Sequence, residues 1–90
     1  MEKIEYHAYV TLNESAILKS TECACIYCFK RFKPVEIKNF CCDIDKDGND
    51  VCETAICPYC QIDAIVPNYL INYTDDDLQR WHKLGFSYGT

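Results

Sequence analysis

The chain has 90 residues, enough for one domain but too few for a second large hydrophobic core. Nine Lys and Arg residues stand against fourteen Asp and Glu, so the formal net charge is −5. A chain with this charge is repelled by phosphate, which argues against a general nucleic-acid binder.

The N-terminal half predicts one strand and two helices. Residues 4–12, IEYHAYVTL, alternate apolar and other side chains and predict a strand with one buried side. Asn13 or Ser15 is a candidate N-cap for a short helix that ends near residue 20. Pro34 suits the first turn of a second helix, expected to run to about residue 42.

The C-terminal half predicts a turn, two strands and a helix. Residues 43–50, DIDKDGND, form an acidic turn, and residues 51–67 predict short strands on both sides of a cysteine turn. Thr74 is a good N-cap for the last helix, with Gly85 as its expected stop. That helix has an apolar stripe spaced every three residues: Leu78, Trp81 and Leu84. The elements together predict a small α+β domain that spans residues 1–90.

Eight cysteines in so short a chain indicate either a secreted disulfide scaffold or a reduced protein that binds metal. The N-terminal sequence MEKIEYHAYV lacks an apolar run of signal-peptide length. No stretch approaches the roughly 20 apolar residues that span a bilayer. We therefore expect a cytoplasmic protein without membrane association, with its thiols reduced and a bound metal.

Two C-x-x-C pairs carry the strongest chemical signal: Cys25 with Cys28, and Cys57 with Cys60. A tight turn with this spacing directs both sulfurs at one cation, and two such turns make a four-cysteine structural Zn²⁺ site. The alternatives are buried cysteines without metal or a redox pair, but a dithiol redox site needs only one C-x-x-C next to a βαβ pattern, which is absent. The prediction is one structural zinc ion per chain, and the alternative is an iron ion in the same site.

Four cysteines remain outside these pairs: Cys23, Cys41, Cys42 and Cys52. Their spacings contain no C-x-x-C turn, so we expect small apolar core residues rather than a second metal site.

The segments CACIYCFKRFKPVEI and TAICPYCQIDAIVP, with a Trp-bearing C-terminal helix, resemble a family of small bacterial and phage proteins with a zinc-ribbon core. The resemblance covers about residues 23–85, and it implies the zinc-ribbon fold and the same four cysteine ligands. The chain departs from the pattern at Gln61, where ribbons favour Gly, so that turn is expected to be strained. The resemblance implies no activity.

The acidic segment offers a weaker cation hypothesis. Asp43, Asp45 and Asp47 with Gly48 match the start of a calcium loop, but Glu53 is one position short of the twelfth-position ligand. The interpretation we favour is a solvated turn, and the alternative is a weak Ca²⁺ or Mg²⁺ site that uses the three aspartates and Glu53.

A local basic cluster offers a nucleic-acid hypothesis. It lies in and after the first cysteine turn, beside two phenylalanines, and comprises Lys30, Arg31, Lys33 and Lys38. The interpretation we favour is a solvated basic face.

The sequence predicts no enzyme, because neither His7 nor His82 has a recognisable nucleophile beside it and four cysteine ligands leave a zinc ion no open position. The leading functional hypothesis is a non-enzymatic adaptor or inhibitor of bacterial or phage origin that binds another protein. The alternative is a nucleic-acid-associated zinc ribbon that uses the basic cluster at residues 30–38.

Overall fold

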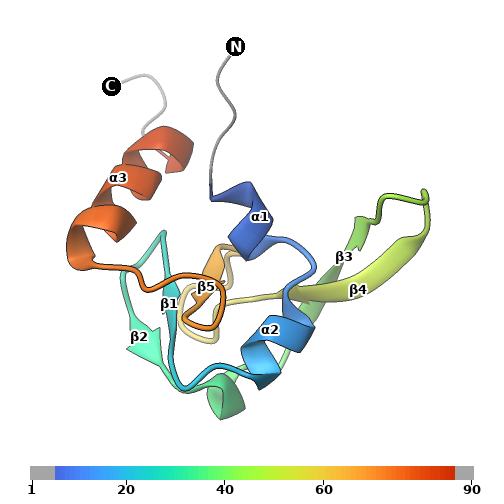
Figure 1. The fold of residues 1–90 in the computed structure, drawn as a ribbon, viewed down its shortest axis with the longest axis horizontal. Helices are drawn as coiled ribbons and strands as arrows, with labels where there is room; N and C mark the ends of the chain where they lie inside the picture. The colour runs from blue at the N-terminus through green and yellow to red at the C-terminus, as the bar shows by residue number, and fades with distance from the viewer. Residues whose placement is uncertain (1–5, 87–90) are drawn as a thin grey trace.

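The computed structural model describes residues 6–86 and shows a small α+β fold with two antiparallel sheets (Figure 1). The first sheet has the strand order β2-β1-β5, formed by Arg31–Phe32, Cys23–Cys25 and Ile65–Pro67. Its central strand β1 is fully buried, as is β5. Antiparallel pairing in the register Cys23 to Pro67 joins the two parts of the chain that carry the cysteine turns.

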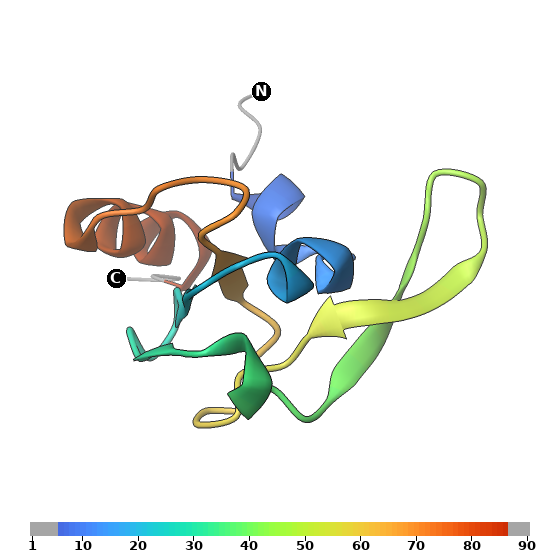
Figure 2. The same cartoon turned by 60° about the horizontal axis from the view of Figure 1, so that its bottom comes forward.

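The second sheet is a two-stranded hairpin of β3 (Phe40–Ile44) and β4 (Asp50–Ala55). The hairpin extends away from the rest of the fold, and its tip is the acidic turn (Figure 2). Gly48, with φ of +84°, adopts the left-handed conformation in that turn, so the predicted turn and strand β4 are both confirmed. A register shift between Cys41 and Asp43 marks a bulge in the ladder.

The predicted N-terminal strand is wrong, because residues His7–Val10 form helix α1; residues 1–5 lie outside the described part of the chain. The buried residues Tyr6 and Val10 are four apart, and that spacing also defines one face of a helix. Helix α1 packs against β5, and its Tyr9 ring lies 5.8 Å from the Trp81 ring. The apolar residues were therefore matched to the period of a strand, whereas they form one face of a helix.

Helix α2 (Glu14–Leu18) is present as expected with Asn13 at its N-cap position, but the Asn13 side chain makes no capping hydrogen bond. The Asn13 side chain is instead buried among three backbone groups. It donates to the carbonyls of Tyr9 (3.0 Å) and Ile65 (2.8 Å) and accepts from the Ala55 N–H (3.1 Å). One side chain thus ties the helical N-terminus to both sheets.

Replacing Asn13 by Ala is expected to destabilise the fold by about 2–4 kcal/mol, because it leaves the buried Ile65 carbonyl and Ala55 N–H without their partner. Urea unfolding followed by circular dichroism measures this difference. Asn72→Ala, at an exposed position, is the matched control and should be close to neutral. Equal unfolding midpoints for the two variants would show that the Asn13 side chain does not stabilise the fold by joining the N-terminal helices to both sheets.

The predicted second helix is wrong beyond its first turn. Pro34–Glu36 forms a single 3₁₀ turn (η1), and Ile37 then returns to extended backbone. The Glu36 carboxylate accepts the Lys33 N–H at 2.9 Å, which closes this short turn. The expected remainder of the helix is β3, because pairing with β4 outweighs the local preference.

Helix α3 (Asp75–Phe86) confirms the predicted C-terminal helix, although it continues through Gly85 to Phe86. A Cβ atom on Gly85 would lie 1.9 Å from the Tyr6 hydroxyl oxygen, so glycine permits close packing here rather than ending the helix. Leu78 and Trp81 are buried, but Leu84 is half exposed and does not belong to the core.

A reciprocal cap begins α3. The Asp77 N–H donates to the Thr74 hydroxyl at 3.2 Å, and the Asp77 carboxylate accepts the Thr74 N–H at 3.0 Å. The hydrogen bond from the Thr74 N–H is the largest cause that lowers the pKa of the Asp77 carboxyl below its ordinary value. The Thr74 hydroxyl and Arg80 lower this pKa further.

Asp77→Ala is therefore expected to cost about 1 kcal/mol of unfolding free energy near neutral pH. A carboxyl with a lowered folded pKa stabilises above its unfolded pKa, and this contribution disappears as the pH falls through the folded value. The difference from the unsubstituted chain should thus shrink on acidification, which urea unfolding at neutral and strongly acidic pH tests. Asp76→Ala, exposed in the same turn, is the control and should show a smaller, less pH-dependent effect.

Candidate metal centre

The first cysteine turn follows strand β1. The Cys25 N–H donates to the Lys30 carbonyl at 2.9 Å, and the Phe29 N–H donates to the Cys25 carbonyl at 2.9 Å. These two bonds fold residues 25–30 into a compact loop that brings Cys25 and Cys28 to the same side.

The second cysteine turn repeats this pattern after strand β4. The Cys57 N–H donates to the Ile62 carbonyl at 2.9 Å, and the Gln61 N–H donates to the Cys57 carbonyl at 3.0 Å. The two turns therefore use the same backbone bonds at equivalent positions, so the chain builds one local structure twice.

Both turns end on a residue in the left-handed conformation, Phe29 with φ of 64° and Gln61 with φ of 66°. The left-handed conformation costs a non-glycine residue roughly 1–2 kcal/mol. The backbone strain expected at Gln61 is therefore present, and Phe29 has the same strain. Phe29 follows Cys28 just as Gln61 follows Cys60. This shared position is the signal from which the sequence could have predicted the same strain at Phe29.

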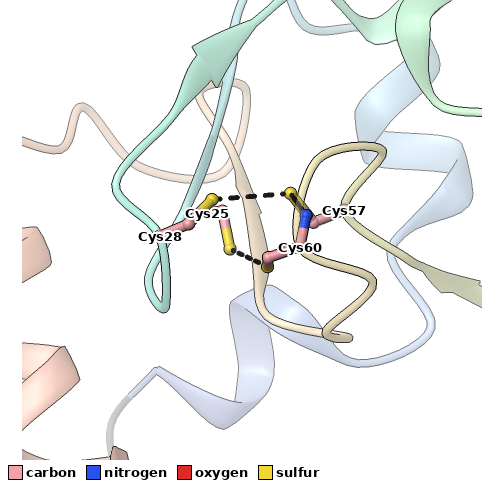
Figure 3. A group of neighbouring side chains, drawn as sticks. All are labelled: Cys25, Cys28, Cys57 and Cys60. Atoms are coloured by element: carbon pink, nitrogen blue, oxygen red, sulfur yellow. Dashed lines mark hydrogen bonds between the residues drawn. The ribbon is translucent and has the colours of Figure 1, made fainter.

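The four sulfurs lie together between the two turns (Figure 3). Cys25 Sγ is 3.5 Å from Cys60 Sγ, Cys28 Sγ is 3.7 Å from Cys57 Sγ, and all four atoms lie within 4.8 Å of one another. Sulfurs bound tetrahedrally at about 2.3 Å from one zinc ion would be about 3.8 Å apart. The arrangement is compatible with a four-coordinate metal site.

Protein groups surround these thiols closely. Cys25 and Cys57 are fully buried, and the N–H groups of Tyr59 and Cys60 lie 3.4 and 3.5 Å from Cys57 Sγ. Burial raises the pKa of the Cys25 thiol, and it raises that of Cys60 to about 11. For Cys57 burial acts in the same direction, but the N–H donors and neighbouring thiols outweigh it and lower its pKa. A metal ion that binds here would displace protons from these thiols.

Aromatic side chains gather around the two turns. The His82 ring lies 5.0 Å from the Phe29 ring and 5.9 Å from the Tyr27 ring, and its Nδ1 is 3.0 Å from the Ile26 carbonyl oxygen. The Lys30 ammonium of the first turn lies 5.5 Å from the centre of the Tyr59 ring in the second turn. We call Tyr27, Phe29, Tyr59 and His82 the aromatic surface.

The remaining cysteines divide into three kinds. Cys23 is buried in the core as expected, and Cys41 is a half-buried free thiol. Cys42 and Cys52 are exposed and form a disulfide across the hairpin, so the expectations of reduced thiols and of core positions are both wrong for this pair. The bulge in the β3–β4 ladder brings these two residues opposite each other, a register that C-x-x-C spacing does not predict.

The structure does not bring the predicted calcium ligands together. The Asp43 carboxylate accepts a hydrogen bond from the Thr54 hydroxyl, whereas the Asp45 carboxylate closes the turn by accepting the N–H groups of Asp47 and Asn49. Within residues 6–86, no three carboxylates among Asp43, Asp45, Asp47 and Glu53 lie within 4.8 Å of one another. This arrangement is compatible with a solvated turn.

The basic cluster is exposed but not free of acidic partners. The Arg31 guanidinium lies 3.3 Å from Glu22 and 2.6 Å from Asp75, so its charge is matched by two carboxylates. Lys30 lies over Tyr59, and Lys33 and Lys38 are exposed.

None of the helices within residues 6–86 has the length and apolar character needed to cross a bilayer. Comparisons of the chain with protein-family models, with curated proteins and with solved structures find no match.

Proposed function

We propose that the chain is a zinc ribbon in which Cys25, Cys28, Cys57 and Cys60 hold one structural Zn²⁺. The convergence of four sulfurs from two turns with the same backbone bonds carries this proposal. Zinc fits better than a hard cation because all four donors are soft thiolates. The resemblance to small bacterial and phage ribbon proteins points the same way. With four protein ligands the ion has no open position, so its role is to stabilise the fold.

Elemental mass spectrometry of protein purified without added metal tests the identity of the ion. We expect about one zinc per chain, retained through dialysis against a weak chelator. Iron in place of zinc would establish the site but not the metal, and protein without any metal would refute the proposal.

We further propose that this ribbon is a non-enzymatic adaptor or inhibitor that binds another protein through the aromatic surface. Tyr27, Phe29 and Tyr59 are 44%, 43% and 53% exposed, although aromatic side chains of this size are favoured in cores. Contacts through His82 and Lys30 join them around the metal site. Exposed tyrosines are typical of protein interfaces, and the acidic net charge of the chain favours a protein partner over a nucleic acid.

Affinity capture followed by calorimetry with the captured protein tests this second proposal. The double variant Tyr27→Ser and Tyr59→Ser should lose a partner that the unsubstituted chain binds, whereas Tyr69→Ser, equally exposed outside the aromatic surface, should retain it. Binding of DNA or RNA with a steep salt dependence that requires Lys30, Lys33 and Lys38 would favour the alternative, a nucleic-acid-associated ribbon.

A further inference from the structure

A second group of metal-ligand side chains lies outside the four-cysteine centre. Cys41, Asp43 and Asp63 each direct one ligand atom into a space where all three atoms lie within 4.8 Å. Cys41 and Asp43 come from strand β3, and Asp63 follows the second cysteine turn. We propose that these three residues form a second, exchangeable site for a divalent transition metal of the zinc class.

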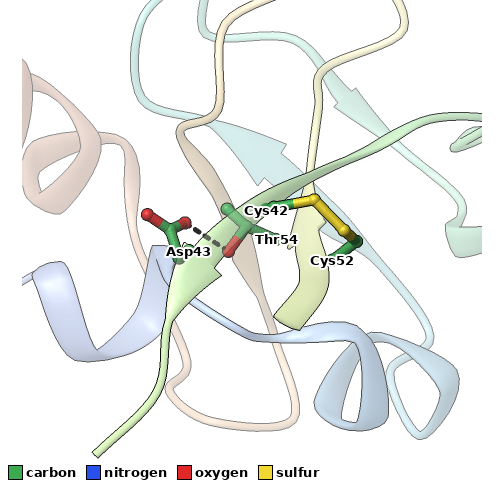
Figure 4. The surroundings of a disulfide bond; sticks show 4 residues. All are labelled: Cys42, Asp43, Cys52 and Thr54. Atoms are coloured by element: carbon green, nitrogen blue, oxygen red, sulfur yellow. Dashed lines mark hydrogen bonds between the residues drawn. A yellow bond between two sulfur atoms is a disulfide. The ribbon is translucent and has the colours of Figure 1, made fainter. Parts of the chain in front are cut away.

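The backbone sets the direction of the two ligands on β3. Residues two apart on a strand point to the same face, so Cys41 and Asp43 share one side and Cys42 points to the other. Figure 4 shows this division: the Asp43 carboxylate is turned toward Thr54, on the side away from the Cys42–Cys52 disulfide. The bulge lies at this same place in the ladder. Bulges commonly redirect side chains at functional sites.

A residue outside the group holds Asp43 in place. Thr54 is buried, donates its hydroxyl proton to Asp43 Oδ2 at 2.6 Å and accepts the Leu12 N–H at 2.8 Å. Leu12 adopts φ of +49° at this contact, so the N-terminal helices contribute to the orientation of a carboxylate on the hairpin. Hydrogen bonds of this kind orient the ligands of metal sites.

The charges in the group lack a positive partner. Within the described residues, neither Asp43 nor Asp63 forms an ion pair with Lys or Arg. Cys41 Sγ nevertheless lies 3.7 Å from Asp63 Oδ2, close to the separation of two ligands on one zinc ion. A divalent cation would neutralise the two carboxylates, and a thiolate donor selects zinc-class metals over Mg²⁺ and Ca²⁺.

This donor set differs in kind from the four-cysteine centre. One thiolate and two carboxylates supply three ligands, which leaves a fourth position for water. Asp63 is exposed and Cys41 only half buried, so that position faces solvent. The ion should therefore bind more weakly than at the four-cysteine centre and exchange with chelators while the fold persists.

Equilibrium dialysis of the full chain against Zn²⁺, read by elemental mass spectrometry, tests the site. Two zinc ions per chain are expected at saturation, falling to one in Cys41→Ser and in Asp63→Asn. Asp47→Asn, an exposed carboxylate in the turn of the same hairpin, should still bind two. Unchanged circular dichroism in the two site variants would show that the loss is not unfolding.

Three results would overturn the proposal: a single ion in the unsubstituted chain that both Cys41→Ser and Asp63→Asn still bind, two ions retained in both site variants, or displacement of the second ion by millimolar Mg²⁺. Failure of the four-cysteine centre gives a different result. In that case Cys57→Ser binds as many ions as the unsubstituted chain, and only Cys41→Ser and Asp63→Asn lose one.

Discussion

Replacing Cys57 by Ser is expected to abolish both the tightly bound zinc and the cooperative unfolding transition. Structural zinc contributes apparent binding free energies of about 10–16 kcal/mol in small metal-dependent domains. The total stability of a domain is about 5–15 kcal/mol, so removing one ligand should leave the chain largely unfolded. Circular dichroism during urea titration measures the transition, and a strong chelator added to the unsubstituted chain should reproduce the same loss.

The control is the double variant Cys42→Ser and Cys52→Ser. It also removes two cysteines, but both are exposed and lie outside the four-cysteine centre. This variant should keep its tightly bound zinc and a cooperative transition. A Cys57→Ser chain that unfolds at the midpoint of the unsubstituted chain would show that the cysteine cluster does not stabilise the fold.

The candidate metal centre could be predicted because its geometry is local. Two cysteines separated by two residues are close enough along the chain to meet within one turn of the backbone, and here each turn closes with hydrogen bonds between residues four or five apart. The sequence does not specify how the two turns face each other, but one shared ion is the simplest arrangement for two such pairs. The structure places their sulfurs together, whereas the identity of the ion stays a prediction.

The errors in the fold arise where long-range contacts decide between two local patterns. Tyr6 and Val10 fit a strand by one period and a helix by another, and packing against β5 selects the helix. Pro34 does begin a helical turn, but pairing of Phe40–Ile44 with β4 draws the following residues into a hairpin. Neither contact can be read from the residues themselves.

The proposed second site was missed for a similar reason. Cys41 and Asp63 are distant in sequence and match no spacing motif, so only the folded hairpin brings them together. The neighbouring aspartates suggested a weak calcium loop for Asp43 as the alternative to a solvated turn, but its carboxylate is bonded to Thr54 and lies close to Cys41 and Asp63. Motif spacing identifies ligands that lie in pairs within one turn, and it fails for single residues that only the fold brings together.

Replacing Trp81 by Ala should cost about 3–5 kcal/mol of unfolding free energy, the second-largest effect expected in this chain. Trp81 is only 1% exposed, and its ring packs 5.8 Å from the Tyr9 ring, so it joins α3 to α1. The cavity left by alanine lies in a small core whose other members cannot move far to fill it.

Leu84→Ala is the matched control for Trp81→Ala, because Leu84 belongs to the same predicted stripe on α3 but is 50% exposed. It should change the stability by less than about 0.5 kcal/mol. Urea unfolding followed by far-ultraviolet circular dichroism is the suitable measurement, since Trp81 is the one tryptophan in the chain and its removal eliminates tryptophan fluorescence. Because Trp81 is no metal ligand, Trp81→Ala should still bind zinc under native conditions while unfolding at a lower urea concentration. Equal effects of the two substitutions would mean that α3 does not pack on the core through Trp81.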